Sequence, residues 1–242
     1  MESEFQMSMM GELTFFFGLQ NKQCKKCTFI HQAKYTKDLL KKFNMVNVKS
    51  LFIPMSTTMT LDPDEDYEAV EQREYKSMIG SLLYMMVTRP DIHFGVCLCA
   101  RFQTSPRVTH RKAVKRIFRY LKYILEFGLW YSASSSLDLI GYSDADFVGC
   151  RIDRNNTSGT CHFLGTSLIC WSSHKQSSVA QSTIEVEYVA VASYCSQILW
   201  IVSIMRDYRL TFKSVPLMCD NSSVICLAKN PIQHGKVKHI NV

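Results

Sequence analysis

The sequence predicts a mixed α/β protein, with a mostly helical first part and a second part whose elements run strand, strand, strand, helix, strand, helix. Amphipathic helical spacing dominates up to about residue 125, whereas β-branched and aromatic runs dominate after a Ser-rich turn at residues 132–136. Of the 242 residues, 47% are hydrophobic and 20% are charged. This composition is typical of a folded chain with one large domain or two smaller ones, and it excludes disordered and fibrous classes.

The first part is expected to contain one strand and several helices. Residues 12–20, ELTFFFGLQ, are an apolar, strand-like run. An amphipathic helix is predicted over residues 29–45, because apolar side chains recur there at helical spacing among lysines. Residues 54–74, rich in Ser, Thr, Pro and acidic residues, predict a solvated linker. Two apolar helical stretches follow in residues 74–102, separated at Pro90, since proline disfavours a helical residue before it.

A basic helix is predicted over residues 109–125, with Gly128 just past its end as a stop signal. Residues 1–136 hold 19 Lys+Arg against 13 Asp+Glu, which leaves 9 against 8 for the rest of the chain. A solvated face is the ordinary explanation for a run of charge, but like charges without acidic partners repel one another unless a polyanion neutralises them. We therefore expect this helix to bind nucleic acid, with salt-dependent affinity. Its basic residues are Arg111, Lys112, Lys115, Arg116, Arg119 and Lys122.

The second part supplies the strands of a sheet. Its strand-like runs are residues 137–149, 157–165, 167–173 and 215–220. A hairpin turn is predicted at Gly165, a long helix between the third and fourth runs, and a last helix from about residue 221. The chain has three tryptophans, which we expect in hydrophobic cores: Trp130, Trp171 and Trp200.

Three acidic residues of the second part lie at or near element ends. Asp144 is in the first strand, Glu187 in the first turns of the long helix, and Asp220 at the end of the fourth strand. A buried carboxylate is costly without a partner, so these acids need a metal or a base. If the first and fourth strands are neighbours, the three carboxylates converge and suit Mg²⁺, which would support hydrolysis of a phosphodiester. Spacing alone does not choose between these residues and the nearby Asp146 and Glu185.

Seven motifs, spread in order over the whole chain, carry a family resemblance. In the first part they are FFFGLQ at residues 15–20, IHQAKYTKDLLKKFNM at 30–45, YKSMIGSLLYMMVTRPDI at 75–92 and HRKAVKRIFRYLK at 110–122. In the second part they are GYSDADFVGCRIDRNNTSGTCHFLG at 141–165, WSSHKQSSVAQSTIEVEYVA at 171–190 and CDNSSVICLAKNPIQHGKVKHI at 219–240. Together they resemble the end of the Pol polyprotein of copia-type LTR retrotransposons, from just after the polymerase active site into the ribonuclease H domain.

The resemblance implies a fold, an activity and three catalytic residues. Residues 1–60 would be the end of a reverse transcriptase palm and thumb, residues 61–136 a connection region with the basic helix, and residues 137–242 a ribonuclease H-like mixed sheet (βββαβα). The implied activity is endonucleolytic hydrolysis of the RNA of RNA:DNA hybrids with Mg²⁺ or Mn²⁺. The catalytic, metal-binding acids of the family fall on Asp144 of YSDAD, Glu187 of VEY and Asp220 of CDN.

The resemblance also implies what this chain lacks. The aspartate pair of the polymerase centre would precede Met1, so we expect no DNA synthesis. The fourth acid of the family would follow Val242, so a second metal ion should be held poorly. Asn241 stands where the family usually has Asp, and Ile184 where it usually has Thr. We therefore weigh an impaired ribonuclease H fragment against a non-catalytic nucleic-acid-binding relic of a transposable element and against a sequence that is never usefully expressed.

The remaining expectations concern compartment and partners. No signal-peptide order is found at the N-terminus, and no apolar run approaches the ~18 residues that span a bilayer. We expect an intracellular protein, in cytoplasmic virus-like particles or the nucleus, that acts on an RNA:DNA hybrid together with the remainder of the polyprotein, with no membrane partner and no small-molecule substrate. Cys24 and Cys27 with His31 are a weak zinc candidate, because no second pair lies nearby.

Overall fold

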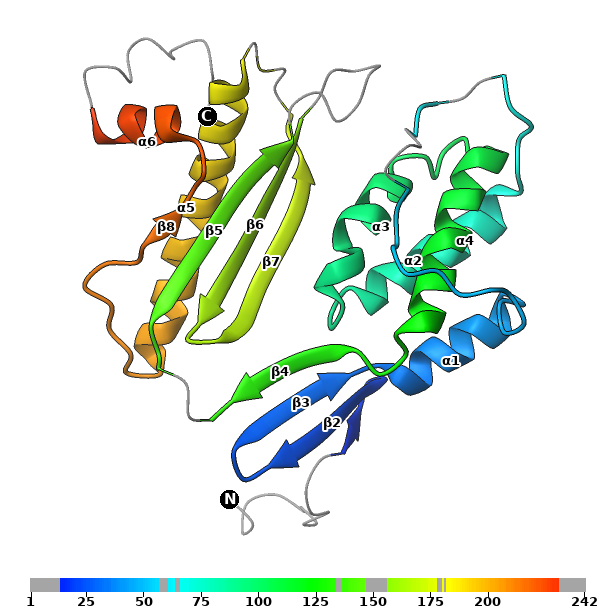
Figure 1. Cartoon of the computed structure of the whole chain (residues 1–242), viewed down its shortest axis with the longest axis horizontal. Helices are drawn as coiled ribbons and strands as arrows, with labels where there is room; N and C mark the ends of the chain where they lie inside the picture. The colour runs from blue at the N-terminus through cyan, green and yellow to red at the C-terminus, as the bar shows by residue number, and fades with distance from the viewer. Residues whose placement is uncertain are drawn as a thin grey trace, which may run out of the picture.

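The computed structural model describes residues 14–56, 61–63, 66–133, 136–146, 156–177, 180 and 182–230. Predictions on residues 147–155 and on the end of the last motif, including Asn241, lie outside the described residues. The described chain is mixed α/β, with two four-stranded sheets and a group of helices beside them (Figure 1).

The first sheet joins strands from the two ends of the first part. Its strands are β1 (Phe15–Phe16), β2 (Leu19–Cys24), β3 (Cys27–His31) and β4 (Gly128–Ser132), in that order and antiparallel throughout. The predicted helix over residues 29–45 is therefore wrong at its start, because residues 29–31 belong to β3 and the helix α1 is Ala33–Lys42. Pairing of β3 with both β2 and the distant β4 overrides the local helical periodicity.

Gly128 has a different role from the predicted one. It opens β4 instead of stopping the preceding helix, which ends at Tyr123. A Cβ atom at this position would collide with the backbone carbonyl of Ile30 and with His31, so only glycine allows β4 to approach β3 this closely.

The helices of the first part share one hydrophobic core. They are α1, α2 (Gln72–Met85), the short 3₁₀ turn η1 (Pro90–Ile92), α3 (His93–Ala100) and α4 (Val108–Tyr123). As predicted, the helical stretch is broken before Pro90. Tyr75, Leu82 and Phe118 are completely buried where the helices meet. The linker predicted over residues 54–74 is only partly solvated and only partly a linker. Leu61 is buried in the same core, and α2 already begins at Gln72.

The second sheet confirms the predicted element order. Its strands are β5 (Leu139–Asp146), β6 (Thr157–Leu164), β7 (Ser167–Lys175) and the two-residue β8 (Leu217–Met218), arranged β7-β6-β5-β8. The first three are antiparallel, and β8 runs parallel to β5. The predicted neighbourhood of the first and fourth strands is thus confirmed. The helix α5 (Thr183–Asp207) covers one face of this sheet, and α6 (Ser222–Lys229) follows β8 (Figure 1).

One side of α5 packs on the sheet. Glu187, Tyr194, Ile198 and Ile201 follow one another at helical spacing and are buried, and the Tyr194 ring occupies the space that a side chain at Gly141 of β5 would need. An 18-residue window of α5 has a mean hydropathy of 1.6 and is 28% buried, so this helix is long and apolar enough to cross a membrane by length and composition. The expectation that no run approaches that length was wrong, although a core helix of a soluble protein passes the same test.

Two of the three tryptophans are not core residues. Trp130 on β4 is 57% exposed and Trp200 on α5 is 63% exposed, whereas Trp171 on β7 is half-buried. Trp200 lies beside Leu199, which is 71% exposed, on the side of α5 turned away from the sheet.

Candidate active site and nucleic-acid interface

Three separate elements position the predicted acids, and each element has a local reason to start or end there. Asp144 lies near the end of β5, next to its parallel neighbour β8. Glu187 lies in the second turn of α5, which begins where the Ser182 hydroxyl accepts the backbone N–H of Glu185 at 3.3 Å. Asp220 follows β8, directly before Asn221, whose side chain caps α6 by accepting the backbone N–H groups of its first turn.

Glu187 is the buried member of this group. Its side chain is 7% exposed, and its Oε2 atom has no hydrogen-bond partner among the residues that the structure describes. Burial raises the pKa of the Glu187 carboxyl, the charges on Asp144 and Asp220 raise it further, and the backbone N–H of Ala145 acts in the opposite direction. An unpartnered buried carboxylate between two others is a group that a bound cation would stabilise.

The charges around Glu187 distinguish Asp144 from Asp146, which the spacing of residues in the sequence had left equivalent. The charges that act on Glu187 are those of Asp144 and Asp220, whereas Asp146 does not contribute. The Oδ1 atom of Asp144 accepts the N–H of Ala145 at 2.9 Å, so Asp144 and Glu187 meet at the same backbone amide. Glu185 is as buried as Glu187 but does not belong to the group of possible metal ligands found in the described part of the chain.

The tightest group of possible ligands includes a residue that the sequence analysis missed. The ligand atoms of Glu187, Cys219 and Asp220 all lie within 4.8 Å of one another, and Asp144 lies outside this group. Consecutive side chains of a strand point to opposite faces, but β8 ends at Met218, so Cys219 and Asp220 can both face Glu187. The only signal in the sequence was that a thiol directly precedes the acid of the CDN motif.

The donor set fits a divalent cation. Two carboxylates and a thiol converge within 4.8 Å, a third carboxylate is near enough to affect the pKa of Glu187, and the buried oxygen of Glu187 has no protein donor among the described residues. Carboxylate oxygens are the ligands that Mg²⁺ prefers.

Asp144 also borders an open cleft of about 720 Å³ between the two parts of the chain. On one side the cleft is lined by η1 and α3, including His93 and Phe94, and on the other by the strands β5 to β7, including Tyr142 and Trp171. The two parts are also joined by a hydrogen bond of 3.0 Å from Arg101 to the Thr157 hydroxyl. A carboxylate of the predicted site is therefore accessible from a cleft with aromatic walls.

The basic helix is only partly available to a ligand. Arg119 donates from Nε to the carbonyl of Lys49 at 2.7 Å, and Lys122 donates to the carbonyl of Val48 at 2.7 Å. Arg111 forms an ion pair of 3.6 Å with Glu74 of α2. Half of the six predicted nucleic-acid-binding residues thus make contacts within the protein, which neither ligand binding nor a purely solvated face had predicted.

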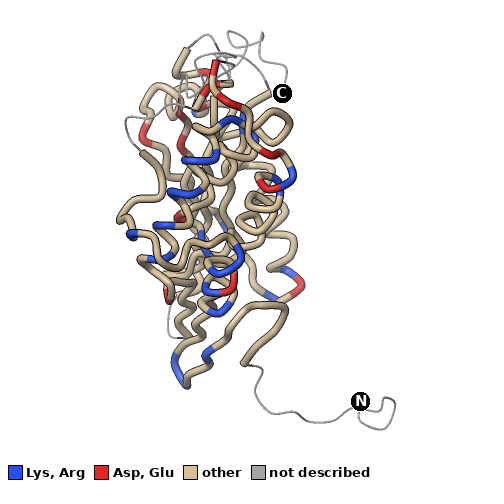
Figure 2. The backbone as a smooth tube through the Cα atoms, turned by 90° about the vertical axis from the view of Figure 1, so that its right-hand side faces the viewer, with Lys and Arg blue, Asp and Glu red and all other residues tan. Residues whose placement is uncertain are grey.

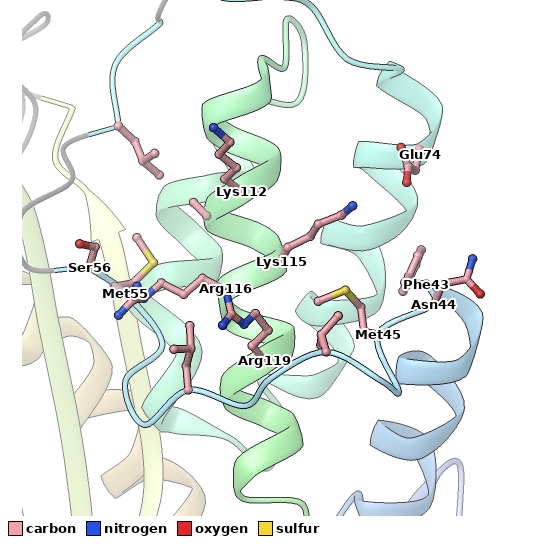
Figure 3. Close-up of a pocket in the computed structure, with 14 residues that line it drawn as sticks. Phe43, Asn44, Met45, Met55, Ser56, Glu74, Lys112, Lys115, Arg116 and Arg119 are labelled. Carbon is pink, nitrogen blue, oxygen red and sulfur yellow. The ribbon is translucent and has the colours of Figure 1, made fainter.

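The other three basic residues of α4 surround a cavity of about 650 Å³. Lys112, Lys115 and Arg116 have no ion pair or hydrogen bond with any residue that the structure describes. Figure 3 shows them projecting from one helix beside the segment that carries Met45 and Met55. Seen from the side of the helices, Lys and Arg positions are spread along the length of the molecule, and acidic positions are more frequent toward one end (Figure 2).

The zinc candidate is not assembled into a site. Cys24 and Cys27 lie opposite each other across the β2–β3 turn, but His31 is at the far end of β3, where it stacks on Phe29. Among the described residues these three side chains do not form a group of possible metal ligands.

Known proteins similar to this chain include retrotransposon polyproteins. The chain is 33% identical over 241 residues to the retrovirus-related Pol polyprotein from transposon RE2 of Arabidopsis thaliana and 32% identical over 251 residues to that from transposon TNT 1-94 of Nicotiana tabacum. These matches cover 99% and 100% of this chain but only 17% and 19% of the relatives, so it spans less than a fifth of their length. An uncharacterized mitochondrial protein of Arabidopsis thaliana is 31% identical over 83% of both chains.

No protein-family model matches the chain, and neither does any solved structure. Its similarity to the Pol polyproteins nevertheless extends over nearly its whole length. Over nearly its whole length the chain is therefore similar to a segment of the retrovirus-related Pol polyproteins of transposons, which supports its origin as a fragment of such a polyprotein.

Proposed function

We propose that this segment is a reverse transcriptase and ribonuclease H fragment, which hydrolyses the RNA strand of RNA:DNA hybrids. The observation that carries the proposal is the convergence of Asp144, Glu187 and Asp220 from β5, from α5 and from the end of β8. Three antiparallel strands, a crossing helix and a parallel fourth strand beside the first are the arrangement expected of a ribonuclease H-like domain over residues 137–242.

Glu187, Asp220 and Asp144 would hold Mg²⁺ or Mn²⁺ in this proposal. When bound, the ion would supply Lewis-acid activation of water and neutralise charge on the scissile phosphate. Glu187, fixed by α5 and the Ala145 amide, anchors the site from the protein interior. Asp144 and Asp220 are exposed carboxylates that complete the site on the side open to solvent, where a nucleic-acid strand can approach. Water is the nucleophile, and no side chain acts covalently.

The first part would hold the hybrid. Residues 1–60 and 61–136 are proposed as the end of the palm and thumb and as the connection region, and the helices on either side of residue 60 share one core. Lys112, Lys115 and Arg116, which carry charge without a partner among the described residues, are the expected phosphate contacts. We expect the remainder of the polyprotein as a partner inside the cell.

A substrate comparison tests the proposal. The whole chain is incubated with a labelled RNA:DNA hybrid, an RNA duplex and a DNA duplex, each with Mg²⁺, with Mn²⁺ and with chelator. We expect cleavage of the hybrid alone, only with metal, and its loss in Asp220→Asn. A chain that binds the hybrid but cuts nothing would be the non-catalytic relic, and cleavage that persists in Asp220→Asn would refute the assigned site.

A further inference from the structure

We propose that Cys219 is a metal ligand, and that Glu187, Cys219 and Asp220 form a mixed thiolate–carboxylate site that binds thiophilic divalent ions such as Zn²⁺ and Cd²⁺. The inference deepens the proposed metal site and rests on it, but it concerns metal selectivity instead of catalysis.

The geometry supplies three convergent donors. The Cys219 sulfur and one oxygen each of Glu187 and Asp220 lie within 4.8 Å of one another, a spacing that a single ion can bridge after small side-chain rotations. The second, independent observation is Glu187 itself, which is only 7% exposed and whose Oε2 atom has no partner among the described residues. A cation bound between this oxygen and the neighbouring thiol would give the buried carboxylate the partner that it lacks.

The ligand chemistry determines which ions are favoured. Mg²⁺ prefers oxygen donors only, whereas Zn²⁺ and Cd²⁺ gain affinity from a thiolate. On binding, the S–H bond of Cys219 breaks, the sulfur bonds to the ion and the proton passes to the buffer. In the metal-free chain burial raises the pKa of the Cys219 thiol, the backbone N–H of Asn221 acts in the opposite direction, and the neighbouring carboxylates raise the pKa further. The chain would thus bind Zn²⁺ at low concentration in the position where catalysis needs Mg²⁺.

The test uses the whole, metal-free chain titrated with Co²⁺ and with Cd²⁺, and it records the sulfur-to-metal charge-transfer absorption. We expect a band that saturates at one equivalent, disappears in Cys219→Ser and is displaced by Zn²⁺ but not by an equal amount of Mg²⁺. In Glu187→Gln the affinity for Cd²⁺ should fall by about 10–100-fold, at least as much as the loss of an outer-shell partner. The matched control is the double variant Cys24→Ser with Cys27→Ser, which removes two thiols that lie opposite each other across the β2–β3 turn and should keep the band.

Each outcome decides the inference. Absence of the band in the wild-type chain, its persistence in Cys219→Ser, or its loss in the Cys24→Ser, Cys27→Ser variant would overturn it, provided that circular dichroism shows the variants folded. If no band forms while the hybrid is still cut with Mg²⁺, the inference fails and the proposed function stands. If the band forms but no hybrid is cut, the metal site stands without the nuclease.

Discussion

Replacing Glu187 with glutamine should stabilise the metal-free protein at neutral pH. The glutamate is 7% exposed, its Oε2 atom has no partner among the described residues, and burial and two neighbouring carboxylates raise its pKa. Glutamine keeps an oxygen that can accept the Ala145 amide. It replaces the unpartnered oxygen with an NH₂ group that can donate to Asp144 or Asp220.

The magnitude follows from the cost of the unpartnered group, which is about 1–3 kcal/mol for a buried polar atom. The direction of the pH dependence follows from the pKa of Glu187, which is raised in the folded state above its ordinary value of 4.5. The folded state therefore binds the proton more tightly, so this group contributes stability below pH 4.5 that is lost as the pH rises through the folded pKa. The gain from glutamine is accordingly expected at pH 7 and should shrink toward pH 4.

Urea unfolding with chelator at pH 7 and at pH 4 measures this difference. A second series with excess Mg²⁺ should stabilise the wild-type chain more than Glu187→Gln, because the variant has lost one of the three carboxylates that would hold the ion. A glutamine variant that is less stable than wild type at pH 7, or equally stabilised at both pH values, would refute the reasoning.

Three further results are expected. Arg89 is 1% exposed and pairs with Asp91 at 2.6 Å, so Arg89→Met should lower the free energy of unfolding by about 3–5 kcal/mol in a urea titration. In salt-dependent hybrid binding, the double variant Lys112→Ala with Lys115→Ala should reduce the slope of log affinity against log salt by about 0.9 for each phosphate that is no longer neutralised. Burial lowers the pKa of His162 below 6.5, so at acidic pH the unfolded state binds more protons than the folded state. Calorimetry should therefore show the stability decreasing as the pH is lowered from about 6.5, and this decrease should be less steep in His162→Phe.

Local patterns predicted the elements whose neighbours are close in sequence. The β6–β7 hairpin at Gly165, the long helix after it and the basic helix before the second sheet are all present near their predicted bounds. Where a partner is distant, local periodicity failed. Residues 29–31 look helical but pair with β4, about a hundred residues later. Gly128 looks like a helix stop but allows that pairing. Trp200 was assigned to a core by its apolar character, yet only the packing of α5 could show that it faces away from the sheet.

The acidic residues of the candidate site could be predicted from the sequence, but their arrangement in space could not. Spacing left Asp144 and Asp146 equivalent, and only the position of the α5 side chains shows which carboxylate acts on Glu187. Cys219 was missed because the end of β8 at Met218, which frees it to face the acids, is set by pairing with β5. Likewise, the use of Arg119 and Lys122 as internal hydrogen-bond donors depends on where residues 48–49 cross α4.

The central claim is that Asp144, and not its neighbour on the same strand face, belongs to the catalytic metal site. The most direct measurement compares the rates at which wild type, Asp144→Asn and Asp146→Asn cleave a labelled RNA:DNA hybrid in Mg²⁺. We expect that Asp144→Asn abolishes metal-dependent cleavage and that Asp146→Asn retains the wild-type rate, because of these two residues Asp144 alone raises the pKa of Glu187. Equal loss in both variants, or undiminished cleavage by Asp144→Asn, would contradict it.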